Sequence, residues 1–88
     1  MNFEIILGVH DKDSVSEGFT GFIIKNLRFG SSYAGSLYDY NQIEFVSKSG
    51  GMKQWLQDYM QFEEHEARFI ATQLENWHTF LTLNNKEL

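Results

Sequence analysis

The stretch Met52–Leu83, MKQWLQDYMQFEEHEARFIATQLENWHTFLTL, constrains the fold of this chain more than any other feature. It contains no glycine or proline, and it is rich in Gln, Glu, Leu, Met and Ala, which favour helices. Its apolar residues fall on one helical face roughly 200° wide, broader than the stripe that an ordinary surface helix buries. We therefore expect this helical region to pack against more than one layer, or against a second molecule.

Two carboxylates, Glu63 and Glu66, interrupt that apolar face if the helix is continuous. A buried carboxylate without a partner is unfavourable, so three explanations compete. The helix breaks or kinks near Gln61–Glu66, or the two acids are paired with Arg28, Lys25 or a tyrosine hydroxyl. In the third explanation, this part of the face is an exposed site for a partner or ligand.

The length of the stretch favours a break or a partner. A straight helix over Met52–Leu83 would be roughly 48 Å long at about 1.5 Å per residue, whereas a compact domain of this size is roughly 30 Å across. The region therefore bends into two helices or extends over another subunit. A variant in which Thr79–Leu83 forms a strand also stays open, because this segment has high β-propensity.

The composition predicts one small domain of 88 residues, of which 42% are hydrophobic and 16% aromatic. Aromatic side chains bury much area per residue, and they also serve as anchors at interfaces. The absence of cysteine excludes disulfides and thiolate metal sites, and it fits a reducing cytoplasm. The sequence has no apolar run long enough to span a membrane and no basic leader segment. We therefore expect a cytoplasmic protein without membrane association.

The charge balance is acidic, with twelve Asp and Glu against seven Lys and Arg and a formal net charge of −5. Direct binding to nucleic acid needs a basic surface, so we expect none. An acidic surface instead suits a basic protein partner, or it imitates a polyanion such as DNA.

Three segments in the first half of the chain predict strands. Phe3–His10 is an almost continuous apolar run, which predicts a central strand covered on both faces. Phe19–Phe29 predicts the second strand, and Tyr33–Tyr40 predicts a third strand that is aromatic and more exposed. Short connections between these segments indicate an antiparallel meander.

Asn41 and Glu44 have the spacing of a capping box and predict a short helix over Gln42–Ser47. The expected fold class is therefore α+β. A three-stranded antiparallel meander (1–40) precedes the short helix and a long, kinked or broken helical region (41–83), which packs on one face of the sheet. The segment 84–88 is expected to be a frayed tail.

Motifs for catalysis or metal binding are weak. Asp11 and Asp13 begin like a calcium loop, but the glycine and glutamate of an EF-hand are missing from their positions. Only Glu63 and Glu66 of the EEHE segment share a helix face, and one carboxylate pair cannot complete a metal shell. The sequence contains no nucleophile elbow and no phosphate-binding glycine loop. We therefore expect no enzyme activity, no metal and no cofactor.

Tyrosines and carboxylates are the candidate partner-binding residues. Alternation along the third strand would place Tyr38 and Tyr40 on one face and Tyr33 on the other. Tyrosines on a half-exposed strand suit a protein interface, although an edge strand that packs its rings on the helices would show the same pattern. Carboxylates would speed association with a basic partner, and the candidates are Asp11, Asp13, Asp58, Glu63, Glu64 and Glu66.

These features predict a protein-binding module that inhibits a larger or basic protein. Toxin-immunity, anti-restriction and anti-CRISPR proteins include small acidic domains of this kind, and DNA mimicry is the sharper form of the hypothesis. One alternative is a homo-oligomeric accessory protein, such as a homodimer whose seam is the wide apolar helix face. The other is a small-ligand-binding domain in which Glu63 and Glu66 line a pocket between helix and sheet.

Overall fold

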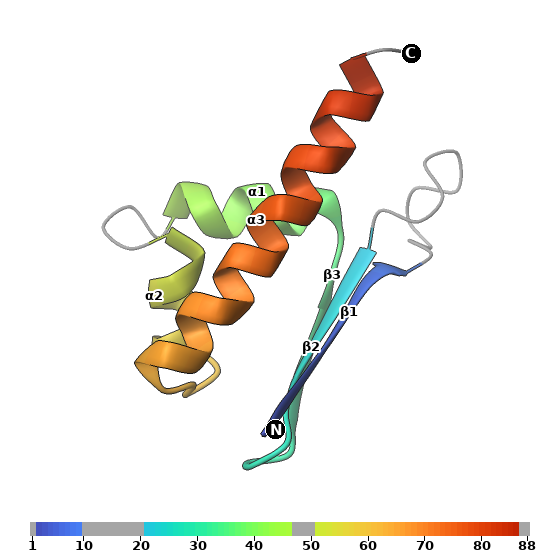
Figure 1. Ribbon diagram of the computed structural model, residues 1–88. Coiled ribbons are helices and arrows are strands. Elements are labelled where there is room, and N and C mark those ends of the chain that lie inside the picture. Colours follow the sequence, from blue (N-terminus) through green and yellow to red (C-terminus); the bar gives the residue numbers. More distant parts are fainter. Residues whose placement is uncertain (1, 10–20, 47–50, 87–88) are drawn as a thin grey trace.

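The computed structural model describes residues 2–9, 21–46 and 51–86, and it has a sheet with helices on one face (Figure 1). The strands form an antiparallel sheet in the order β1-β2-β3. This arrangement confirms the predicted α+β class with a meander followed by helices. The elements are β1 (Phe3–Val9), β2 (Gly21–Asn26), β3 (Ser31–Gly35), α1 (Leu37–Val46), α2 (Gly51–Asp58) and α3 (Glu64–Lys86).

The central strand is β2, and its side chains alternate between the covered and the open face of the sheet. Phe22, Ile24 and Asn26 are buried on the helix side, whereas Ile23 and Lys25 are only partly buried. The helices therefore pack mainly on the even-numbered residues of β2.

The first strand lies at an edge of the sheet, so the prediction of a central strand covered on both faces is wrong. Its Ile5 pairs with Ile24 of β2, and among the described residues no strand pairs with its other side. Helices cover only one face of the sheet, which leaves Ile6 on the open face 38% exposed. An apolar run in a strand is thus compatible with cover on one face only.

The third strand is shorter than predicted, because the segment Tyr33–Tyr40 contains the end of β3 and the start of α1. Ser36 and Asp39 cap this helix. The Ser36 N–H donates to Asp39 Oδ2 at 2.7 Å, and the Asp39 N–H donates to Ser36 Oγ at 3.3 Å. The predicted cap Asn41 instead lies inside α1, so the boundary between the sheet and the helices is at Ser36.

The predicted break in the long helical region is confirmed. The helix α2 ends at Asp58, and α3 begins at Glu64. Between them Gln61 adopts a left-handed backbone conformation with φ of 60°, while Met60 and Phe62 are buried. The two helices therefore turn different faces toward the core, which accounts for the wide apolar face of the sequence.

The third helix continues to Lys86, so the variant with a strand at Thr79–Leu83 is wrong and the helical region extends past Leu83. Its 23 residues correspond to about 34 Å at the usual rise per residue, close to the 38 Å longest extent of the molecule. Figure 1 shows its C-terminal part reaching beyond α1. Among the described residues, no helix is long and apolar enough to cross a bilayer.

The hydrophobic core fills the space between the sheet and the helices. It draws residues from β2, from all three helices and from the connection between α2 and α3. Its buried members are Phe22, Ile24, Tyr40, Met52, Leu56, Met60, Phe62, Ala67, Ile70, Leu74 and Trp77.

Candidate protein-binding site

The end of β2 fixes the connection between α2 and α3. Asn26 is buried, and its Nδ2 donates to the Met60 carbonyl oxygen at 2.8 Å, while its Oδ1 accepts from the Arg28 N–H at 3.1 Å. A buried amide side chain requires such partners. Because the acceptor is a main-chain carbonyl, Asn26 fixes the backbone conformation of the connection between α2 and α3.

Glu66 joins the start of α3 to the sheet. Its Oε1 accepts from the Glu63 N–H at 3.0 Å, and its Oε2 accepts from Arg28 Nη2 at 3.1 Å. The first contact is that of a capping box with Glu63 as the N-cap residue, and a carboxylate in the first turn is also favoured by the helix dipole. Glu66 is only 5% exposed, so its predicted role as a partner-binding residue is wrong. Its charge is used inside the fold.

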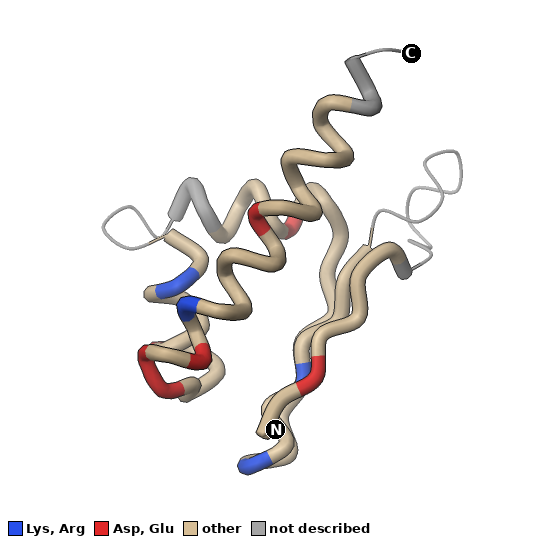
Figure 2. Tube along the Cα trace, in the orientation of Figure 1, with Lys and Arg blue, Asp and Glu red and all other residues tan. Residues whose placement is uncertain are grey.

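The neighbouring acids Glu63 and Glu64 are both exposed at the start of α3. Glu63 Oε2 lies 3.7 Å from His65 Nδ1, and Glu64 Oε1 accepts from Arg68 Nη2 at 2.7 Å. Figure 2 shows acidic segments gathered at the turn between α2 and α3, with basic segments close by on both helices. This surface therefore offers carboxylates that are partly balanced by cations.

Three aromatic rings form a cluster beside this turn, and we call it the Tyr33–Trp55–Tyr59 cluster. Trp55 and Tyr59 lie one turn apart at the end of α2, with ring centroids 5.1 Å apart and an interplanar angle of 11°. Tyr33 of β3 meets both rings edge-on, at 4.9 Å and 6.3 Å. The ring of Phe22 lies 6.0 Å from that of Tyr33 and connects the cluster to the core. Tyr59 is 66% exposed, so it is the outermost ring.

Carboxylates lie next to the cluster. Asp58 is exposed beside Tyr59, and both of its oxygens accept from Gln54 Nε2 at 2.9 Å. Burial raises the pKa of Tyr33 above 10.0, and the charges of Asp39 and Tyr59 raise it further. Tyr33 therefore keeps its proton at neutral pH, and its hydroxyl remains a hydrogen-bond donor.

The structure brings together only part of the predicted partner-binding set. Tyr33 and Asp58 belong to or adjoin the cluster, whereas Tyr38 is 68% exposed on α1. Tyr40 is 1% exposed and stacks on His78 at 4.6 Å, so its prediction as a surface contact is wrong. Burial on the inner side of α1 accounts for this difference. The predicted residues Asp11 and Asp13 lie outside the described part of the chain.

Sequence reasoning missed Trp55 and Tyr59 as site residues, because it assigned both to the apolar face of one long helix. Their spacing of four residues did carry the signal that they share a helix face. A helix that ends at Asp58 leaves the ring of the next residue at the surface. The break in the helix is thus what exposes this pair.

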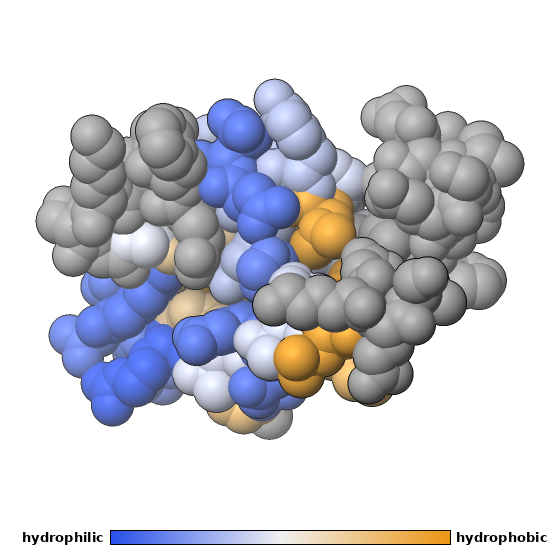
Figure 3. All heavy atoms as spheres, turned by 90° about the horizontal axis from the view of Figure 1, so that it is seen from above, coloured by the Kyte–Doolittle hydropathy of each residue, from blue (hydrophilic) through white to orange (hydrophobic). Residues whose placement is uncertain are grey.

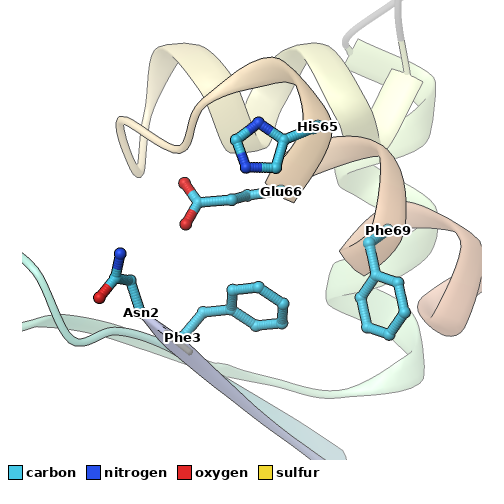
Figure 4. Close-up of a pocket in the computed structure, with 5 residues that line it drawn as sticks. All are labelled: Asn2, Phe3, His65, Glu66 and Phe69. Carbon is cyan, nitrogen blue, oxygen red and sulfur yellow. The ribbon is translucent and has the colours of Figure 1, made fainter.

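A second feature is an open groove between β1 and α3. One pocket of about 390 Å³ adjoins another of about 320 Å³, and both are lined by Phe3 and Phe69, so they form one groove. Figure 4 shows the side chains of Asn2 and Glu66 pointing into the first pocket beside the Phe3 ring. Both Glu66 oxygens already accept hydrogen bonds from within the chain, and most of the exposed surface that lines the groove is apolar. Its remaining lining residues are Ile5, Leu7, His65 and Gln73.

The chain shows no significant match to a family model, to a curated protein or to a solved structure. Within residues 2–9, 21–46 and 51–86, no group of three or more His, Asp or Glu is placed to hold a metal ion. The Tyr33–Trp55–Tyr59 cluster and the β1–α3 groove are therefore the features on which a proposed function rests.

Proposed function

We propose that this protein is a binding module for a basic protein, and that the Tyr33–Trp55–Tyr59 cluster is its anchor. The observation that carries this proposal is the stack of Trp55 on Tyr59 at an exposed helix end. Tryptophan and tyrosine are the residue types that most often dominate binding energy at interfaces. Such a stack on the surface of a small protein is typical of a contact site.

The cluster is already ordered before a partner arrives. Tyr33 holds both outer rings edge-on and rests on Phe22 of the core. Binding therefore requires little loss of side-chain freedom, which is a major cost of forming an interface. A preformed aromatic anchor supports tight binding by a small contact area.

The charges around the cluster suit a basic partner. Asp58 adjoins Tyr59, and the exposed acids Glu63 and Glu64 follow along the connection. A partner lysine or arginine is attracted both to these carboxylates and to the exposed face of an aromatic ring. Charges of this kind mainly speed association, while the aromatic anchors hold the complex.

DNA mimicry is a weaker form of this proposal. A mimic needs carboxylates that stand free like phosphates, but Glu4, Glu64 and Glu66 each lie against a cation of the same chain. We therefore favour recognition by aromatic contact. We propose that the module inhibits its partner by occupying a surface that the partner needs. We also propose that it acts in the cytoplasm, with which a sequence without cysteine is compatible.

The test compares capture of a partner by the wild type and by Tyr59→Ala. The tagged proteins are incubated with lysate of the native cell, and the captured protein is identified and then titrated in purified form. We expect Tyr59→Ala to weaken its binding by about tenfold or more. Tyr38→Ala is the matched control, because Tyr38 is exposed to a similar degree on another element. Equal binding by both variants would contradict the proposed anchor.

A charge variant tests the basic nature of the partner. We expect Glu63→Lys to slow association several-fold at low salt, and the difference should vanish at high salt, because exposed charges are then screened. Stopped-flow or biosensor association rates give this measurement. An association rate that is the same at both salt concentrations would exclude electrostatic attraction by these acids.

A further inference from the structure

Within residues 2–9, 21–46 and 51–86, the outer edge of β1 has few of the features that normally protect a sheet edge. Such edges carry charges or proline, or a neighbouring segment covers them. Glu4 is the one charged residue of β1, and it pairs across the open face with Lys25 at 3.4 Å. Ile6 and Leu7 are 38% and 36% exposed on opposite faces. The edge is therefore apolar on both sides.

The backbone of β1 alternates between its partner strand and this edge. The Leu27 N–H donates to the Asn2 carbonyl oxygen at 2.8 Å, so the polar backbone groups of Asn2 point toward β2. In an antiparallel ladder this direction alternates with every residue. The backbone groups of Phe3, Ile5 and Leu7 therefore point outward. A bulge follows at Gly8, where φ is 78°, and ends this regular pattern.

An apolar stripe of α3 lies on the same side of the molecule. Phe69 is 46% exposed, and its ring lies 5.7 Å from that of Phe3. Phe80 and Leu83, also exposed, lie on the same face of α3 about three and four turns further along, beyond the polar residues Thr72, Gln73 and Asn76. In Figure 3, hydrophobic residues interrupt the mainly hydrophilic surface of the described residues in the view from above. The groove thus has the edge strand β1 as one wall and the face of α3 that carries Phe69 as the other.

We propose that a second copy of this chain occupies the edge, and that the two β1 strands pair antiparallel about a two-fold axis at Ile5. In this register Ile5 lies opposite Ile5 of the other copy, and Phe3 lies opposite its Leu7. All three outward-pointing residues of each strand then form hydrogen-bonded pairs, and the pairing ends at the Gly8 bulge. The two sheets become one sheet of six strands.

A second copy fits both walls of the groove at once. The axis is perpendicular to the sheet, so the helices of both copies lie on the same face, and each Phe69 stripe faces the groove of the other copy. Ile5 and Leu7 provide apolar cross-strand neighbours. Glu4 is already balanced by Lys25 of its own chain, so the paired strands add no charge repulsion to that between the two acidic chains.

The expected dimer is weak. The paired segment is short, and the exposed apolar side chains beside it are few, so the interface lies at the small end of the range for specific complexes. We expect dissociation in the micromolar range. The dimer uses a different surface from the Tyr33–Trp55–Tyr59 cluster, so either proposal can fail without the other.

Sedimentation equilibrium of the full chain from about 5 µM to about 500 µM tests the proposal. We expect a reversible monomer–dimer equilibrium that salt strengthens, because two chains of net charge −5 repel each other. Binding of a basic partner at the cluster has the opposite salt dependence. A monomer throughout this range, or association weakened by salt, would overturn the dimer.

Hydrogen exchange locates the seam without any substitution. The amides of Ile5 and Leu7 should exchange fast at low protein concentration and slowly at high concentration, whereas those of Glu4 and Ile6 should be protected at both. Uniform protection of all four amides at both concentrations would place the seam elsewhere.

A proline substitution in β1 tests whether the dimer forms through the edge of this strand. Leu7→Pro removes an outward N–H that β2 does not use, so the fold persists while pairing at the edge is lost. Leu7→Ala is the matched control, since it shortens the same side chain but keeps the N–H. We expect Leu7→Pro to be monomeric and Leu7→Ala to dimerise. A folded Leu7→Pro variant that still dimerises would refute pairing through β1.

Discussion

Arg28 and Glu66 form an ion pair whose two members differ in burial. Glu66 is 5% exposed, whereas the Arg28 side chain is 32% exposed. Loss of the arginine leaves a buried carboxylate without its cation, which is the unfavourable case. Loss of the glutamate charge leaves a guanidinium that still reaches water. The two single substitutions are therefore not equivalent.

We expect Arg28→Ala to lower the free energy of unfolding by about 2 kcal/mol, and Glu66→Gln by about 1 kcal/mol, because glutamine still accepts from the Glu63 N–H. Chemical denaturation measures both. Arg68→Ala is the control, because its pair with Glu64 is exposed, and it should change stability by less than about 0.5 kcal/mol. Equal losses for Arg28→Ala and Glu66→Gln would contradict this account of the pair.

Tyr33 should make the protein less stable in alkaline solution. Burial, followed by the charges of Asp39 and Tyr59, raises its folded pKa above the ordinary value of 10.0. The native state thus holds this proton more tightly than the unfolded chain. The resulting stability is complete below the unfolded pKa and is lost as the pH rises through the folded pKa.

Unfolding free energies between about pH 9 and about pH 11 test this dependence. We expect Tyr33→Phe to flatten the decrease, since phenylalanine has no proton to lose. Tyr38→Phe changes an exposed ring on α1 and should keep the wild-type slope. The same slope in Tyr33→Phe as in the wild type would assign the alkaline sensitivity to another group.

The residue pattern alone identified the conflict at Glu63 and Glu66 and named Arg28 as a possible partner. It treated a helix break and an ion pair as alternatives, whereas the structure uses both at Glu66. That combination depends on how the β2–β3 turn approaches α3, and contacts between segments far apart in sequence are not encoded in local periodicity. Tyr40 was misplaced for the same reason, because its burial depends on packing between layers.

At the scale of elements, the connection between α2 and α3 contains a strained residue. Gln61 has φ of 60°, a conformation that costs a non-glycine residue about 1 kcal/mol or more. We expect Gln61→Gly to raise the free energy of unfolding by roughly 0.5 kcal/mol. Glycine relieves the backbone strain of the folded state, but it also increases the conformational entropy of the unfolded chain, which offsets part of this gain. Denaturation midpoints at unchanged slope give this value.

The matched control for this substitution is Gln54→Gly, which places the same change at an exposed position in the middle of α2. It should lower the free energy of unfolding by about 1 kcal/mol, because glycine is unfavourable in a helix interior. If both variants were destabilised alike, the left-handed conformation at Gln61 would not be a source of strain.

Most elements were predictable because each has its own period of apolar residues. The start of α1 was not, because Tyr38 and Tyr40 alternate like strand residues, and the cap formed by Ser36 and Asp39 was overlooked in favour of the later one at Asn41. The position of β1 at the sheet edge was also missed. The order of strands in a sheet depends on their mutual contacts, and hydrophobicity along one strand does not determine it.

At the scale of the whole molecule, we expect the sheet and the helices to unfold together. The core draws on both layers, and the bonds from Asn26 and Arg28 to the α2–α3 connection join them further. Fluorescence of Trp55 and Trp77 reports on the helical layer, while far-UV circular dichroism reports on all secondary structure. At low protein concentration the two denaturation curves should coincide. Separate midpoints would contradict a single cooperative domain.

The contacts of Asn26 and Arg28 have a consequence for how this sequence tolerates change over evolutionary time. Asn26 binds the main chain of residue 60, so this hydrogen bond is compatible with any apolar side chain that fits the core there, whereas Asn26 itself should not change. Arg28 instead binds the side chain of Glu66, so these two positions should change only together in related chains. In related chains we therefore expect Asn26 to be invariant, and positions 28 and 66 to be substituted together.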